Sequence, residues 1–179
     1  IIIGDPHLYR TLATMDPDFR ETFKVKADFD FQIDRSQENI VAFACFISDH
    51  CKREKLRHFD LSGVARVIEQ CARAVENQDK LSTRFSDVAD LLIESDYWAG
   101  KENATLVSAK HVERAIVEKR FRLDLIEKRL QELIADGIVL VDVDGSVLGQ
   151  VNGLAVYQMG DFSFGKPSRI TAKTFMGRG

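Results

Sequence analysis

Few residues in this chain combine the type and the spacing that a chemical site requires. Cys45, His50, Cys51 and His58 form the densest group of side chains able to bind a metal ion. Cys45 and Cys51 lie six residues apart in a segment with helical periodicity, so they point about 120° apart around the helix axis. We therefore expect no metal site in this group.

The acidic run Asp142-Val-Asp144-Gly145 resembles the start of a calcium-binding loop but lacks the third ligand and the closing Glu. Asp-Gly favours the positive φ angles of a tight turn, so we predict a hairpin here. The sequence has no Gly-x-x-x-x-Gly-Lys-Ser/Thr loop, His-Glu-x-x-His motif, Cys-x-x-Cys pair or Gly-x-Ser-x-Gly turn. We predict no catalytic residue in this chain.

Composition is that of a folded domain, with 30% charged and 45% hydrophobic residues among 179. A net charge of −3 gives no bulk attraction to nucleic acid or to an anionic membrane. No apolar run approaches the roughly 20 residues of a membrane helix, and no signal peptide opens the chain. The chain has three cysteines, an odd number that does not suit a disulfide framework, so we expect reduced thiols in a cytoplasmic protein.

Apolar residues spaced three or four apart predict four helices that would position any site. They cover 36–54, about 60–75, about 82–99 and 108–137. Asp34 or Ser36 would cap the first and Ser108 the last. The fourth pattern is longer than a typical helix of about 11–12 residues. It either bends near Arg120–Arg122 or forms a rigid connector.

Strands are predicted towards both ends of the chain. At the start these are Ile1–Ile3 and the alternating run 23–31, with a turn or helix start at Asp16-Pro17-Asp18 between them. Further on, 138–143 and 147–151 would form a hairpin. Runs 151–156 and 169–175 would be strands separated by a Gly/Pro/Ser turn. Because both ends lie in strand patterns, we expect a piece of a longer protein.

Three segments, 16–25, 81–88 and 150–156, resemble in order and spacing the ATP-dependent Lon proteases. They are most similar to bacterial Lon-like relatives on the archaeal-type (LonB) branch. The resemblance covers essentially the whole chain and is most specific towards its C-terminus. In that family an AAA+ ATPase module precedes a protease domain with a Ser-Lys dyad, and the subunits form a hexamer.

The resemblance implies an α+β fold, with a mostly helical AAA+ lid subdomain between two partial domains. Residues 1–33 would be the end of the large AAA+ subdomain, 34–117 the lid, 118–137 a connecting helix and 138–179 the truncated, β-rich start of the protease domain. The parent would use ATP and Mg²⁺ to unfold and degrade unfolded or damaged proteins. This chain would bind no nucleotide alone and be inactive.

Arg84 sits where the family places its sensor-2 arginine, which can reach nucleotide phosphates from the lid. The alternative is a helix-start arginine paired with Asp87 or Asp90.

Arg20 lies near the family's arginine-finger position, which Thr22 occupies in this sequence. Its alternative is a surface ion pair.

Asp5 lies near the sensor-1 position, where relatives often carry a polar residue. Its alternative is a turn-forming Asp before Pro6. In many Lon proteases an acidic residue of the second protease strand comes near the active site. Its counterpart in this sequence is Thr171, so we carry no catalytic role onto that strand.

Two other functions fit parts of the pattern. A winged-helix DNA-binding module would use the helix ending near Leu133 for recognition and the Asp-Gly hairpin as its wing. The sequence is acidic overall and this helix is charge-balanced, so DNA is an unfavourable partner. A non-enzymatic helical adaptor would instead bind a partner protein through the 112–134 stripe.

Overall fold

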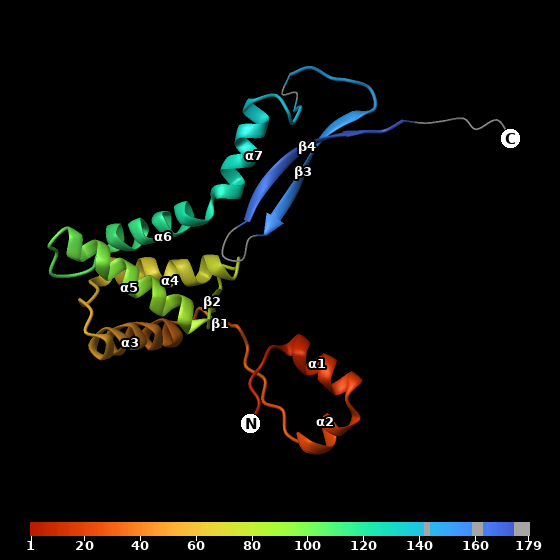
Figure 1. Ribbon diagram of the computed structural model, residues 1–179. Coiled ribbons are helices and arrows are strands. Elements are labelled where there is room, and N and C mark those ends of the chain that lie inside the picture. Colours follow the sequence, from red (N-terminus) through yellow and green to blue (C-terminus); the bar gives the residue numbers. More distant parts are fainter. Residues whose placement is uncertain (142–143, 159–162, 174–179) are drawn as a thin grey trace. The chain divides into compact units, whose positions relative to one another are not determined.

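The computed structural model describes residues 1–141, 144–158 and 163–173 (Figure 1). The chain divides into two compact units, Ile1–Phe31 and Gln32–Gly179. Within the described ranges, no helix is both long enough and apolar enough to cross a membrane.

Two short helices form the first unit, α1 (Pro6–Met15) and α2 (Pro17–Thr22). Each follows an Asp cap and begins with a proline, whose missing N–H has no helical partner at that position in any case. The ring of Phe19, the buried residue of α2, lies 5.7 Å from that of Tyr9 and 5.1 Å from that of Phe23. The helix start predicted at Asp16-Pro17 is confirmed.

The strands predicted at Ile1–Ile3 and over 23–31 are wrong. Ile1 and Ile3 are almost fully exposed, and neither run pairs with a strand among the described residues. An isolated extended run has no ladder of hydrogen bonds to stabilise it, whatever its β propensity.

The second unit contains the helices that sequence periodicity predicts. They are α3 (Gln37–Glu54), α4 (Leu61–Ala74), α5 (Phe85–Lys101), α6 (Ala109–Leu123) and α7 (Leu125–Ala135). The Ser36 hydroxyl accepts the Asn39 N–H at 3.2 Å and caps α3, as predicted. Asp60 caps α4 in the same way through the Gly63 N–H, at 2.9 Å.

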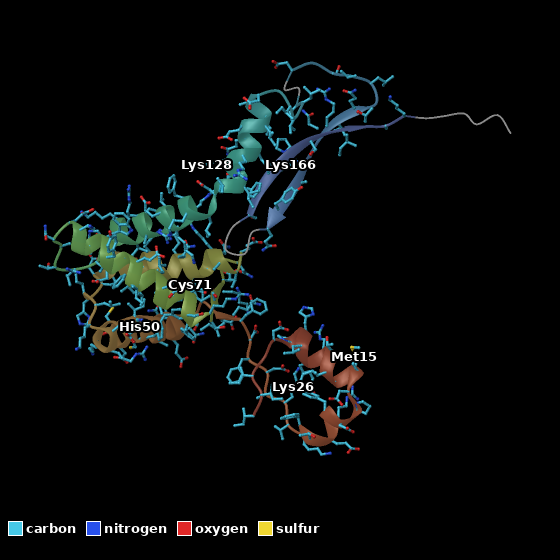
Figure 2. All side chains as sticks on the ribbon, in the orientation of Figure 1. Met15, Lys26, His50, Cys71, Lys128 and Lys166 are labelled. Atoms are coloured by element: carbon cyan, nitrogen blue, oxygen red, sulfur yellow. The ribbon has the colours of Figure 1, made fainter. Side chains whose placement is uncertain are left out.

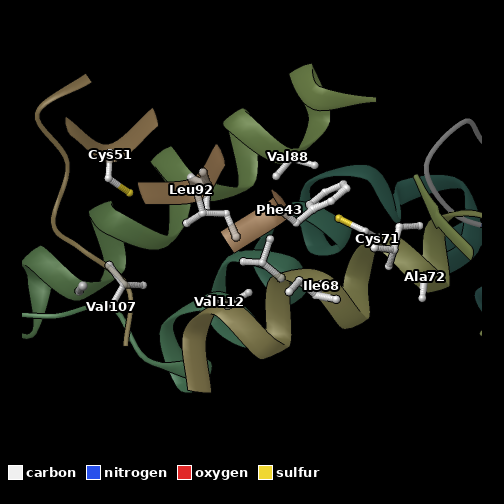
Figure 3. Packing of buried hydrophobic residues seen from close by; sticks show 13 residues of the cluster. Phe43, Cys51, Ile68, Cys71, Ala72, Val88, Leu92, Val107 and Val112 are labelled. Atoms are coloured by element: carbon white, nitrogen blue, oxygen red, sulfur yellow. The ribbon is translucent and has the colours of Figure 1, made fainter. Parts of the chain in front are cut away.

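Helices α3 to α6 surround the core of this unit, together with Leu81 (Figure 3). Helix α6 packs against α4 and α5, and α3 packs against the same two helices. The buried apolar residues are Phe43, Ile47, Cys51, Val67, Ile68, Cys71, Ala72, Leu81, Val88, Leu92, Ala99, Val107 and Val112. Phe85, at the start of α5, lies outside this set and is 42% exposed.

The long pattern from Ser108 to Gly137 forms two helices, because the helix is interrupted at Asp124. Of the two predicted alternatives the interrupted one is observed, slightly after Arg120–Arg122. Helix α7 has no buried residue.

The hairpin predicted between 138–143 and 147–151 is wrong for its described residues. Ile138 and Val139 both donate their N–H to the Leu133 carbonyl at 3.0 Å, and Gly137 donates to Ile134. Gly137 has a φ of 69°, so these bonds end α7 in a Schellman-type cap rather than starting a strand. Gly145 does take the predicted positive φ, 83°. Residues 142–143 lie outside the described ranges.

The C-terminal strands β3 (Gln150–Gln158) and β4 (Ser163–Thr171) pair antiparallel, with Gln150 opposite Thr171. The first confirms a predicted strand. The second begins earlier than predicted and includes Pro167, which a two-stranded sheet tolerates because one edge of each strand is unpaired. Residues 174–175 of the predicted strand lie outside the described ranges.

Candidate functional site

A small sheet positions the residues around Arg84. Its strands are β1 (Gln32–Asp34) and β2 (Lys80–Ser82), which pair antiparallel with Gln32 opposite Ser82. Lys80 Nζ lies 2.6 Å from Asp34 Oδ1 and links the two strands by an ion pair. Leu81 is fully buried, so the middle of β2 is anchored in the core.

Arg84 stands between this sheet and α5 as the residue that caps the helix. Its backbone N–H donates to the Ser82 hydroxyl at 3.3 Å, and its carbonyl accepts the N–H groups of Asp87 and Val88. The side chain is exposed. Among the described residues its guanidinium has no hydrogen-bond or ion-pair partner, so the predicted alternative, a pair with Asp87 or Asp90, is not formed.

The position of Arg84 suits an anionic ligand. Unbonded N–H groups and the helix dipole give the N-terminus of a helix such as α5 a partial positive charge. The guanidinium adds a full charge and donors in a planar fork that matches phosphate oxygens. The two features lie at one point of the chain, where β2 passes into α5.

Asp5 and Arg20 belong to the first unit. Asp5 Oδ1 accepts the N–H groups of His7 at 2.6 Å and Leu8 at 2.9 Å, and these bonds lower the pKa of the Asp5 carboxyl. Asp5 is therefore an ionised helix cap whose Oδ2 accepts no hydrogen bond from the described residues.

Arg20 is exposed in the last turn of α2. The surface ion pair considered as its alternative is not formed with any described residue.

The cysteine and histidine group does not form a site. In the described part of the chain no three His, Cys, Asp or Glu side chains are placed to bind a metal ion. His50 is buried, with Nδ1 2.9 Å from Arg53 Nη2, and Cys71 lies in the core (Figure 2). Burial raises the pKa of Cys71 to about 11 and also raises that of Cys51, so both thiols stay protonated at neutral pH.

Sequence reasoning missed an apolar groove of about 460 Å³ between α3 and α4. Ile40 and Cys45 line it from α3, Leu61 and Ile68 from α4, and Arg35 stands beside them. The sequence indicates this groove only through apolar residues of α3 and α4 that follow the spacing of the core residues but are not buried. Leu61 is one of them and is 87% exposed.

Three relatives are similar to about two thirds of the chain. The identity is 29% over 132 residues to the Archaeal Lon protease of Thermoplasma acidophilum, covering 69% of this chain. The identity to the Archaeal Lon protease of Thermoplasma volcanium is 26% over 132 residues, again covering 69% of this chain. The identity to the Archaeal Lon protease of Archaeoglobus fulgidus is 27% over 127 residues, covering 66% of this chain. The chain spans about a fifth of these relatives, 19% of each.

Two family models match separate parts of the chain. One describes a LonB-like AAA domain and matches residues 1–30; the other describes the AAA+ ATPase lid domain of archaeal LonB and matches 58–122. Both models and the three relatives agree that the chain is similar to Lon proteases of the LonB type. The lid match runs from α4 almost to the end of α6 and includes Arg84. The AAA match includes Asp5 and Arg20.

Proposed function

We propose that this chain is the part of an ATP-dependent serine endopeptidase that couples nucleotide state to the protease domain, with Arg84 as the nucleotide-sensing residue. The observation that carries the proposal is the Arg84 guanidinium at the start of α5, inside the region similar to the LonB lid: it is exposed and has no partner among the described residues. A lid arginine that contacts a bound phosphate makes lid position depend on hydrolysis.

The residues of this chain fit such a nucleotide. The Arg84 guanidinium is paired with no carboxylate in the described ranges, so all its donors are available for phosphate oxygens. ATP with Mg²⁺, when bound to the complete protein, supplies the phosphoryl group that is hydrolysed. Arg84 would hold a phosphate oxygen and thereby fix the lid.

The boundaries that we propose are those implied by the resemblance. Residues 1–33 end the large AAA+ subdomain, 34–117 form the lid, 118–137 connect it and 138–179 begin the protease domain. Four apolar residues on β3 and β4 are at least 56% exposed, and further strands of a protease domain would cover them: Val151, Leu154, Val156 and Ile170.

The complete protein would be a homo-hexamer acting on unfolded or damaged proteins. We propose that Arg20 reaches the nucleotide of a neighbouring subunit in this ring. Its exposure and lack of a described ion-pair partner support this role, although Thr22 aligns with the usual finger position. Asp5 would act as the sensor-1 residue through Oδ2 while Oδ1 keeps its cap.

Replacing Arg84 tests the proposal. In the complete protein we expect Arg84→Ala to slow ATP-driven degradation of an unfolded substrate by about tenfold to a hundredfold, since hydrogen bonds to charged groups contribute about 1.5–3 kcal/mol. Arg84→Lys should recover only part of the rate, because an ammonium group cannot form the bidentate contact. Degradation and ATP hydrolysis are measured side by side, with circular dichroism to verify the fold.

Arg73→Ala is the matched control, because Arg73 is an exposed helix arginine whose ion pair with Glu69 lies on α4. This variant should keep nearly normal rates. If Arg84→Ala and Arg73→Ala behave alike, Arg84 is no sensor. If the protein is instead a helical adaptor, neither variant should change a rate of degradation or ATP hydrolysis, and the chain should bind a partner protein tightly.

A further inference from the structure

The direction of the Arg84 side chain depends on the backbone that carries it. No described protein group holds the guanidinium, so its place relative to the lid core is set where β2 passes into α5. On the upstream side the backbone is held by the buried Leu81 and by the bond from the Arg84 N–H to Ser82. Strand β2 is only three residues long and pairs with one partner strand.

On the downstream side the backbone is held by a ring contact that immediately follows Arg84. The Phe85 ring centroid lies 4.7 Å from that of Phe46 and 5.5 Å from that of Phe43, both on α3. These distances fall within the range for favourable aromatic pairs. The first turn of α5 is thus fastened to α3 by the residue adjacent to Arg84.

The exposure of Phe85 distinguishes this contact from ordinary core packing. Phe43 is 2% exposed and Leu92 is fully buried, whereas Phe85 is 42% exposed and is not among the buried core residues. Its ring therefore packs at the edge of the hydrophobic core, on the buried Phe43, rather than within the core. What the ring does fix is the start of α5 relative to α3.

We propose that Phe85 is the positioning residue of Arg84: by packing on Phe46 and Phe43 it fixes the start of α5, so that the guanidinium is presented in one direction from the lid. The inference rests on the proposed function of Arg84 and names the residue on which that function depends. Phe85 itself touches no nucleotide; it acts through Arg84 alone.

The test is a double-mutant cycle in the complete protein, read out as the Kd of a fluorescent ATP analogue and as kcat and KM of ATP hydrolysis. Phe85→Ala should weaken nucleotide binding about as much as Arg84→Ala does, roughly tenfold. The double variant should be no weaker than Arg84→Ala, because residues that act through one contact are non-additive. Phe85→Tyr keeps the ring and should restore the Kd.

Tyr97→Ala is the matched control, since Tyr97 is a 54% exposed aromatic residue on the same helix. It should leave the Kd unchanged. Phe85→Leu keeps an apolar side chain without the ring and serves if Phe85→Ala does not fold. It should weaken binding in the same direction by a smaller factor.

The nucleotide-sensing role of Arg84 and the positioning role of Phe85 can be disproved separately. An unchanged Kd in Arg84→Ala overturns the proposed function and this inference with it. A weakened Kd in Arg84→Ala combined with a normal Kd in Phe85→Ala, or with an additive double variant, overturns only the positioning role. A Phe85→Tyr variant as weak as Phe85→Ala also overturns it, because the ring contact would then not be what matters.

Discussion

At the scale of single residues, Gly63 shows how closely α4 approaches the segment before α6. A Cβ at position 63 would lie 2.6 Å from the Val107 carbonyl oxygen and 3.2 Å from Phe59 Cδ1. That oxygen already accepts the Asp60 N–H at 2.9 Å, next to the Phe59–Val107 bridge. Only glycine lets α4 begin at this distance from the 107 backbone.

Gly63→Ala should therefore destabilise the chain, although alanine is the better helix former. We expect a loss of about 1–3 kcal/mol from overpacking, offset by about 1 kcal/mol of helix propensity. Urea unfolding of the 179-residue chain measures the difference. Leu61→Ala, in the same turn at 87% exposure, should stay within about 0.5 kcal/mol. A Gly63→Ala chain as stable as the parent would show that the bridge moves freely.

At the scale of secondary-structure elements, the junction of α6 and α7 is a defined break. Lys128 Nζ lies 3.1 Å from Asp124 and 3.9 Å from the Phe121 ring centroid, and the Arg120 guanidinium lies 3.4 Å from both Glu127 oxygens. The side chains at 120, 121, 124, 127 and 128 share one side of the helix. Arg122 Nη2 lies 2.7 Å from both carboxylate oxygens of Glu94 and ties the end of α6 to α5.

Asp124→Ala should favour one continuous helix. Aspartate is a poorer helix former than alanine by up to about 0.7 kcal/mol, so the continuous form should gain about threefold in population. Spin labels at Val117→Cys and Arg129→Cys, in a Cys45→Ser background, should then report a narrower distance distribution near 18 Å, the rise of about twelve helical residues. The matched variant Asp136→Ala, at the end of α7, should leave the distribution unchanged. Identical distributions in all three chains would exclude Asp124 as the cause of the break.

Sequence patterns predicted α3 and α4 because local signals agree there: an apolar stripe, a capping side chain and a terminating turn. Helix α5 has no capping side chain and was predicted from its apolar stripe. Sequence patterns failed at Ile1–Ile3 and at 138–141, where apolar content indicates a strand but pairing partners or a helix cap decide the outcome. Arg84 was proposed as a site residue through the family resemblance. Phe85 was not, because spacing alone cannot separate a core residue from one that fastens a helix end.

At the scale of the whole molecule, both units depend on carboxylates at helix ends. Hydrogen bonds from Ser62 and Gly63 lower the pKa of Asp60, bonds from Lys110 and His111 lower that of Glu102, and backbone bonds lower that of Asp5. A carboxyl whose folded pKa is lowered binds its proton less readily than in the unfolded chain. These carboxylates therefore stabilise the folded state at pH values above their ordinary pKa of about 4. The stabilisation is lost as the pH falls towards their lowered pKa in the folded state.

We expect the urea concentration at the midpoint of unfolding to be constant above about pH 5. It should decrease as the pH falls from about 4 to the lowered pKa values. The triple variant Asp5→Asn, Asp60→Asn and Glu102→Gln should start lower and show a flatter profile across that range. Asparagine still caps a helix, so the slope measures charge rather than loss of the cap. Asp90→Asn removes an exposed carboxylate of α5 that has no partner among the described residues, and it should keep the parent profile. Equal slopes in the parent and the triple variant would place the acid sensitivity in other carboxylates.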